Sequence, residues 1–157
     1  MDGLLGPLGE VAGRGLQVLN PELQGRLVAP VALVDKPRHQ RRDPMFEDFS
    51  GSGGHMAIVG GPQSGKSMGL RAACAGLALT HTPEEVGFYV LDFGGGGLAS
   101  MRSMPHMGSA CGRLDIDRVR RTVAEINSMR TSRELMFAEL GICLLYTSDA
   151  ADERSSV

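Results

Sequence analysis

The hydrophobic and polar positions of the first half of the chain predict three strands. Residues 29–35 are mostly apolar and predict a strand that ends at Lys36-Pro37. Residues 45–49 alternate apolar and acidic side chains, as an edge strand does. After a glycine-rich turn at 50–54, the apolar run His55–Val59 predicts a short buried strand.

A helix and a further strand follow. The segment from about Lys66 to Thr80 is rich in alanine and leucine and predicts a helix. One face of it should pack on the sheet, and this face comprises Leu70, Ala73, Cys74, Leu77 and Ala78. Residues 88–92 predict a second buried strand. Strand, helix and strand with a short return form a βαβ unit, so we expect a parallel sheet.

The downstream pattern continues the alternation. Residues 94–97 are four glycines at the carboxyl end of the predicted strand, the edge at which open α/β sheets bind ligands. A short helix is expected over 98–104 and a short strand over 108–111. Asp115 or Asp117 then caps a long helix. Its apolar positions recur at helical spacing and are Ile116, Val119, Val123, Ile126 and Met129.

The two ends of the chain differ from its middle. Residues 1–29 show no sustained period and predict a linker, with one short helix near Leu4–Val11. Residues 30–142 form the predicted domain. Residues 143–157 resemble the translation of a transposase-type sequencing adapter, so we expect a non-native tail on a gene fragment.

Composition limits the class of protein. A chain of 157 residues with 42% hydrophobic and 22% charged residues fits one soluble domain or slightly less. Three widely spaced cysteines form no C-x-x-C pair, which favours a reducing compartment over a disulfide framework or zinc site. The net charge of −2 comes from the tail, so residues 1–142 are neutral and a DNA partner is unlikely on charge.

Two groups of basic residues have alternative interpretations. The run from Lys36 to Arg42 is best explained as a solvated turn, with a phosphate-facing or partner-facing surface as the alternative. Arginines of the long helix lie mostly opposite its apolar face. They suit a solvated surface, or a contact with a neighbouring module and its nucleotide.

The strongest chemical signal is a phosphate loop. Its eight residues match G-x-x-x-x-G-K-[ST] between a predicted strand and a predicted helix, and they are Gly60, Gly61, Pro62, Gln63, Ser64, Gly65, Lys66 and Ser67. Backbone N–H groups of such a loop wrap a phosphate chain, aided by the helix dipole. Lys66 would reach the β- and γ-phosphates of ATP, and the Ser67 hydroxyl would ligate Mg²⁺.

The role of Asp92 has more than one interpretation. An acidic residue that ends a buried strand is typical of a Walker B motif. Yet no second carboxylate follows it to position water, and a binding loop or a structural cap fits 92–97 equally well.

Several segments together resemble the FtsK/SpoIIIE-type ATPase modules of type VII secretion systems. They cover roughly residues 12–142 and include Val34–Pro37, Gln40–Pro44, Gly54–Ser67, Ala78–Pro83, Phe88–Gly96, Pro105–His106 and Gly112–Val123. The resemblance implies a truncated α/β P-loop NTPase fold with a parallel sheet flanked by helices. It also makes 1–29 the linker from a preceding module, and places the Walker B strand downstream of this chain.

The same resemblance implies a function and a location. It implies an ATP- and Mg-binding module of a motor that exports small helical-hairpin proteins from the cytoplasmic face of the cell membrane. The partners would be other ATPase modules of the same chain or a hexamer, the secreted substrates and a membrane secretion complex. A DNA-translocating motor and a non-hydrolysing, ATP-dependent docking module are the alternatives.

Overall fold

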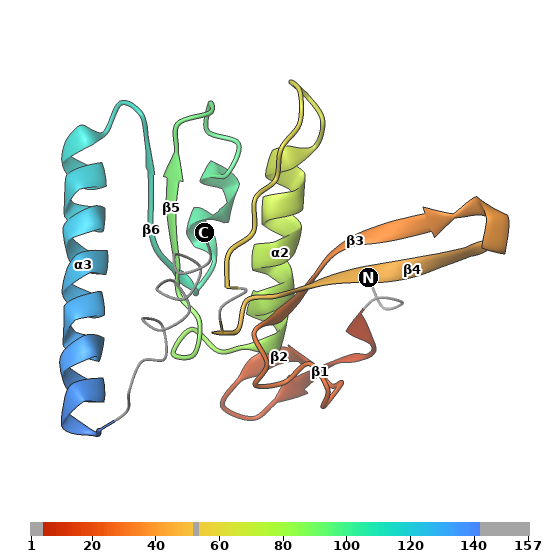
Figure 1. Cartoon of the computed structure of the whole chain (residues 1–157), viewed down its shortest axis with the longest axis horizontal. Coiled ribbons are helices and arrows are strands. Elements are labelled where there is room, and N and C mark those ends of the chain that lie inside the picture. The colour runs from red at the N-terminus through yellow and green to blue at the C-terminus, as the bar shows by residue number, and fades with distance from the viewer. Residues whose placement is uncertain (1–4, 52–53, 142–157) are drawn as a thin grey trace, which may run out of the picture. The chain divides into compact units, whose positions relative to one another are not determined.

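The computed structural model describes residues 5–51 and 54–141, and the chain divides into two compact units between Arg113 and Leu114. In its described part, the first unit contains three two-stranded sheets and helix α2 (Lys66–Thr80). The second contains helix α3 (Ile116–Glu139) (Figure 1). Residues 143–157, the predicted non-native tail, lie outside the described residues.

The βαβ unit predicted a parallel sheet built from strands at 55–59 and 88–92, whereas the parallel pairing is between β5 (Phe88–Asp92) and β6 (Met107–Gly112). The short helix expected between them is η3 (Ala99–Ser103). Gly108 is needed at this pair, because a Cβ there would lie 2.7 Å from the Tyr89 ring. Within the described residues this parallel sheet has two strands.

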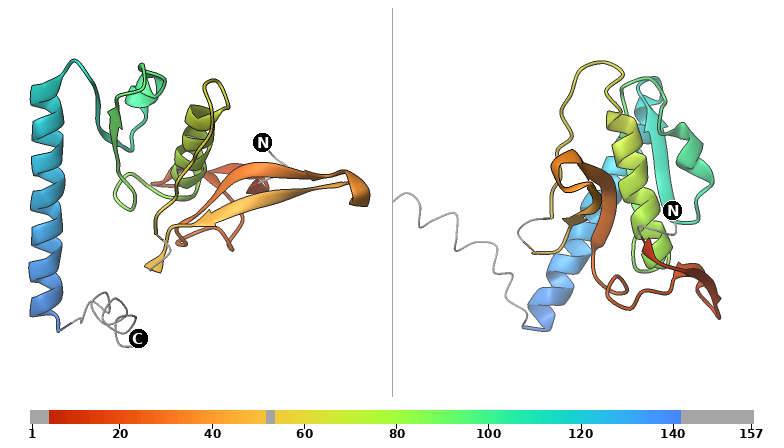
Figure 2. Two further views of the ribbon diagram at one scale, coloured as in Figure 1. Left: turned by 45° about the horizontal axis from the view of Figure 1, so that its top comes forward. Right: turned by 90° about the vertical axis from the view of Figure 1, so that its right-hand side faces the viewer.

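Helix α2 has the predicted bounds and packs against β3 (Val28–Lys36), as both views of Figure 2 show. Gly76 makes the close approach possible, since a Cβ there would lie 2.7 Å from Pro30 Cδ. On the predicted inner face Ala73 and Leu77 are buried, whereas Cys74 is only half-buried. An apolar groove of about 150 Å³ remains between this helix and β3.

The predicted buried strand at His55–Val59 is wrong. These residues have no strand assignment, and the Val59 side chain is 93% exposed. A strand requires hydrogen bonds to a neighbouring strand, and no described segment pairs with this one. The Ile58 side chain lies against α2 at Gly69, since a Cβ added to Gly69 would be 3.1 Å from Ile58 Cδ1.

Strand β3 forms an antiparallel ribbon with β4 (Arg41–Asp48), joined by η1 (Pro37–His39). The predicted strand at 45–49 therefore begins earlier than expected and has β3 as its neighbour. Asp43 lies 2.5 Å from Lys36 and 3.0 Å from Arg41. Part of the basic run is thus neutralised within the ribbon, which fits its interpretation as a turn.

The predicted helix near Leu4–Val11 is wrong over Leu8–Val11, which form strand β1 of a hairpin with β2 (Gly15–Val18). Gly13 and Gly15 explain the difference, because both have positive φ angles (77° and 73°) and allow a tight reversal. A small apolar core joins the hairpin to its flanking residues and consists of Leu5, Val18 and Leu23. Assignment of 1–29 to an intermodule linker stays a prediction, but their described part is folded.

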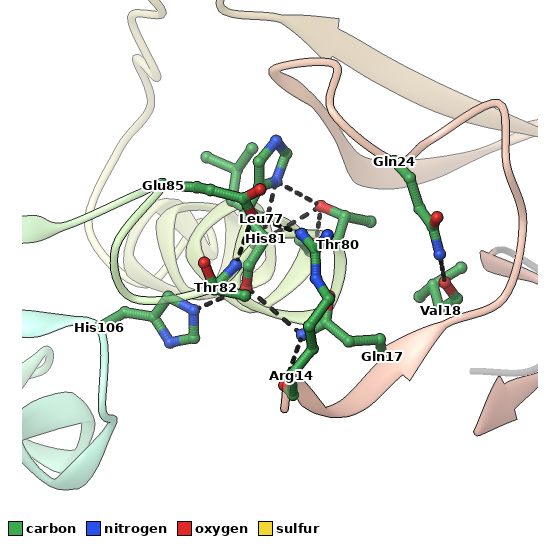
Figure 3. A network of polar contacts seen from close by, with 11 residues as sticks. Arg14, Gln17, Val18, Gln24, Leu77, Thr80, His81, Thr82, Glu85 and His106 are labelled. Atoms are coloured by element: carbon green, nitrogen blue, oxygen red, sulfur yellow. Dashed lines mark hydrogen bonds and ion pairs between the residues drawn. The ribbon is translucent and has the colours of Figure 1, made fainter. Parts of the chain in front are cut away.

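Polar contacts fasten this hairpin to the end of α2 (Figure 3). The carbonyl oxygen of His81 accepts hydrogen bonds from Gln17 Nε2 (3.4 Å) and His106 Nε2 (2.9 Å). Arg14 pairs with Glu85 at 2.6 Å, and Glu85 also accepts the Thr82 N–H. That backbone bond, aided by Arg14, lowers the pKa of Glu85. Segments far apart in sequence are therefore joined at one point.

In the second unit, Asp115 caps α3 as predicted. Its carboxylate accepts the backbone N–H of Arg118 at 3.3 Å. Arg130 pairs with Glu134 one turn along at 3.5 Å, an exposed contact of small energetic weight. Across the described ranges, no helix is both long enough and apolar enough to span a bilayer.

Candidate functional site

The phosphate loop ends in a backbone geometry suited to anions. Gly65 caps α2 in the left-handed region, with φ of 87°, and Gln63 also has a positive φ of 58°. The first hydrogen bond of the helix runs from the Gly69 N–H to the Gly65 oxygen at 2.9 Å. The N–H groups of the first turn before Gly69 therefore have no partner within the helix, and they carry its positive dipole end.

The loop is tightly closed at its start. A Cβ on Gly60 would lie 2.5 Å from Ser64 Oγ and 3.2 Å from Ser64 Cβ, so a side chain there would require Ser64 to move. By contrast, a Cβ on Gly61 would meet no atom within 4 Å. The loop is thus narrow at one end and open beside Gly61.

The ammonium group of Lys66 folds back over this opening. Its Nζ donates to the carbonyl oxygens of Gly60, at 2.7 Å, and of Gly61, and lies 3.5 Å from Ser64 Oγ. Lys66 therefore places a positive charge over the mouth of the loop, held by exposed contacts that a stronger acceptor can replace.

A second glycine segment lies beside the end of the phosphate loop. A Cβ on Gly97 would be 3.6 Å from Ser67 Oγ and 3.7 Å from Ser67 Cβ. The glycine loop, which we define as Gly94–Gly97, follows β5 and thus reaches Ser67 in the first turn of α2. The sequence placed this loop at the ligand-binding edge, but not beside Ser67.

Asp92 holds the glycine loop. One carboxylate oxygen accepts the Gly94 N–H at 3.0 Å and the other accepts the Leu98 N–H at 2.9 Å. These bonds lower the pKa of Asp92, the Leu98 bond most, against the opposing effect of burial, and Arg71 adds a smaller favourable charge. Of the interpretations that the sequence left open, a Walker B carboxylate, a binding loop and a structural cap, the geometry favours the cap, because both oxygens are engaged with the loop.

Sequence reasoning missed Arg71. It lies one turn after Ser67 on α2, so both side chains share a helix face. Its Nε is buried without a hydrogen-bond partner in the part of the chain that the structure describes, and Nη1 lies 3.7 Å from Met68 Sδ. The i, i+4 spacing from Ser67 was the one available signal.

The eight predicted site residues therefore lie on one continuous loop at the start of α2. Their arrangement satisfies the local requirements of a phosphate-binding loop. The roles of Lys66 and Ser67 toward phosphate and Mg²⁺ stay predictions.

The chain is similar to known proteins. The chain is 53% identical over 142 residues to the ESX secretion system protein EccC of Thermomonospora curvata, a match over 90% of this chain and 11% of that protein. It thus spans about a tenth of that relative's length.

Two solved structures from the same organism are equally similar in sequence. The cytoplasmic domain of the type VII secretion ATPase EccC superposes with a TM-score of 0.84 at 53% identity, over 90% of this chain and 16% of that one. EccC ATPases 2 and 3 in complex with a signal sequence peptide give 0.83 and 53%, over 90% and 25%.

These similarities confirm the predicted P-loop ATPase fold, although the described sheets are small. They also agree with the predicted relation to type VII secretion ATPases, and the P-loop type of ATPase implies a nucleotide. The family model of FtsK/SpoIIIE matches residues 26–153, most of the chain. The chain therefore belongs to the FtsK/SpoIIIE family.

Proposed function

We propose that this chain binds ATP with Mg²⁺ as one ATPase module of a type VII secretion motor. The observation that carries the proposal is the position of Lys66, whose ammonium binds the loop carbonyl oxygens at the positive end of α2, where the helix hydrogen bonds begin only at Gly69. The 53% identity to EccC of T. curvata supports the assignment to secretion.

The residues present fit a nucleoside triphosphate. The loop from Gly61 to Gly65 offers backbone N–H groups, and the open space beside Gly61 admits a phosphate. Lys66 would exchange neutral carbonyl acceptors for charged phosphate oxygens, which make hydrogen bonds about twice as strong. The Ser67 hydroxyl would hold Mg²⁺, which when bound neutralises charge on the β- and γ-phosphates.

The described residues suit binding better than hydrolysis. Asp92 has both carboxylate oxygens committed to the glycine loop, so we assign it no proton-transfer role. Hydrolysis by the larger protein would then depend on carboxylates outside the described site.

The proposed partners follow from the relatives. EccC of T. curvata has been solved as ATPases 2 and 3 with a signal sequence peptide, and as a cytoplasmic domain. We therefore propose that this module works beside other ATPase modules, in one chain or a hexamer, at the inner face of the cell membrane. Its larger protein would engage helical-hairpin substrates and a membrane secretion complex.

The test is titration of the 157-residue chain with a fluorescent ATP analogue in the presence of Mg²⁺. Lys66→Ala should weaken binding by about tenfold or more, because it removes a charge-assisted contact worth about 1.5–3 kcal/mol. Lys36→Ala is the matched control, since Lys36 is the other lysine of the sequence and lies on the β3–β4 ribbon. Unchanged affinity in Lys66→Ala would overturn the assignment.

A further inference from the structure

We propose that the glycine loop forms a wall of the magnesium side of the nucleotide site. In this proposal Gly97 must lack a side chain so that a hydrated Mg²⁺ ion can reach Ser67 Oγ. The inference rests on the proposed function, and it assigns to Gly94–Gly97 a role that the phosphate-loop pattern does not include.

The first observation is the contact between the two loops. Gly97 is 30 residues from Ser67 in sequence, yet a Cβ on it would lie 3.6 Å from Ser67 Oγ. This distance is ordinary van der Waals contact, so an added methyl group would fit without a clash in the absence of an ion. Gly97 also has no positive φ, unlike Gly95 and Gly96 at 117° and 81°. Backbone conformation therefore does not explain the glycine at this position.

The second observation is that the loop is fixed in place. Asp92 binds both ends of it, through the Gly94 N–H at 3.0 Å and the Leu98 N–H at 2.9 Å. Arg71 on α2 adds a charge that favours the ionised carboxylate. A loop held at both sides by the carboxylate at the end of its own strand can act as a fixed wall.

The chemistry of magnesium explains why a small wall residue matters. Mg²⁺ binds oxygen ligands at about 2.0–2.1 Å in an octahedron and keeps several waters. Waters adjacent to Ser67 Oγ in that octahedron would lie about 3 Å from it, by this geometry. A methyl group at 3.6 Å from the same atom competes for that space. The phosphates, bound by backbone N–H groups and Lys66, do not depend on it.

The experiment separates the contribution of Mg²⁺ to binding from that of the nucleotide itself. The full chain and its variants are titrated with a fluorescent ATP analogue, once with MgCl₂ and once with EDTA, and the ratio of the two affinities is the magnesium gain. Gly97→Ala should keep the parent's affinity in EDTA. Its magnesium gain should be about tenfold smaller than that of the parent chain, as expected for a change next to a metal ligand. Gly97→Val should lose more.

Gly87→Ala is the matched control. Gly87 lies outside the glycine loop and has no positive φ either, and its Cβ would make ordinary contact, 4.0 Å from the His106 carbonyl oxygen. It should keep the gain of the parent chain. Asp92→Asn tests the tether independently, because it leaves Gly97 in place but weakens the bonds to Gly94 and Leu98. It should reduce the gain, and binding in EDTA reports that each variant is folded.

Four outcomes are informative. A reduced gain in Gly97→Ala and Asp92→Asn, with Gly87→Ala unchanged, supports the proposal. The same gain in the parent chain and in both Gly97 variants overturns it, as does a parent chain that binds the analogue without any gain. A parent chain that fails to bind the analogue in either buffer overturns the proposed function as well.

Discussion

The contact between α2 and β3 predicts that two glycines of one helix respond oppositely to alanine. In Gly76→Ala the new Cβ would lie 2.7 Å from Pro30 Cδ and 3.2 Å from Pro30 Cγ. The proline ring is rigid and sits in β3, so the strand or the helix has to shift. Such overpacking costs about 1–3 kcal/mol, against a gain of about 1 kcal/mol in helix propensity.

We therefore expect Gly76→Ala to lower the free energy of unfolding by about 1 kcal/mol, the balance of these two terms. In a chain of this size that corresponds to a melting temperature about 2–4 °C lower. Gly69→Ala is the control on the same helix. Its Cβ would lie 3.1 Å from Ile58 Cδ1, the free end of a flexible side chain, so it should keep most of the propensity gain.

Urea and thermal unfolding of both variants, followed by circular dichroism, make the comparison. The packing argument is refuted if Gly76→Ala is as stable as the parent chain or more so. It is also refuted if both variants lose equal stability, since that would show that crowding by Pro30 has no specific effect.

Two further predictions concern titratable groups. The lowered pKa of Asp92 stabilises the folded chain above its ordinary value of 3.8, and this stability is lost as the pH falls through the lower pKa of the folded state. In urea titrations the parent chain should therefore be more stable than Asp92→Asn at neutral pH and should lose this difference in acid. The same dependence of unfolding free energy on pH in both chains would contradict this. Burial raises the pKa of Cys74 above 9.0, so iodoacetamide should alkylate this thiol more slowly in the folded chain than in urea, as peptide mass spectrometry can measure.

Local signals account for the elements that could be predicted. Helix α2 begins and ends where its pattern predicted, because the phosphate loop before it and the Thr82-Pro83 break after it lie next to it in sequence. The Asp115 cap is likewise a contact between residues three positions apart. The phosphate loop belongs to this class, since its eight residues are contiguous.

Elements that depend on distant partners could not be predicted. His55–Val59 has the composition of a buried strand, but a strand exists only where a neighbour supplies hydrogen bonds. The N-terminal hairpin is held through contacts such as Arg14 with Glu85, which are 71 positions apart. No pattern in residues 1–29 carries information about that partner.

Asp92 shows why a site needs geometry as well as motif. From the sequence it could be a metal ligand or a cap, because either role places an acidic residue at the end of a strand. Its two oxygens distinguish the roles, since each accepts a backbone N–H of the segment that follows. In the proposed nucleotide site, a carboxylate used in this way would act through the position of Gly97 rather than through its own charge. The proposed chemistry of Lys66 and Ser67 would therefore also depend on Asp92, which is not part of the phosphate-loop motif.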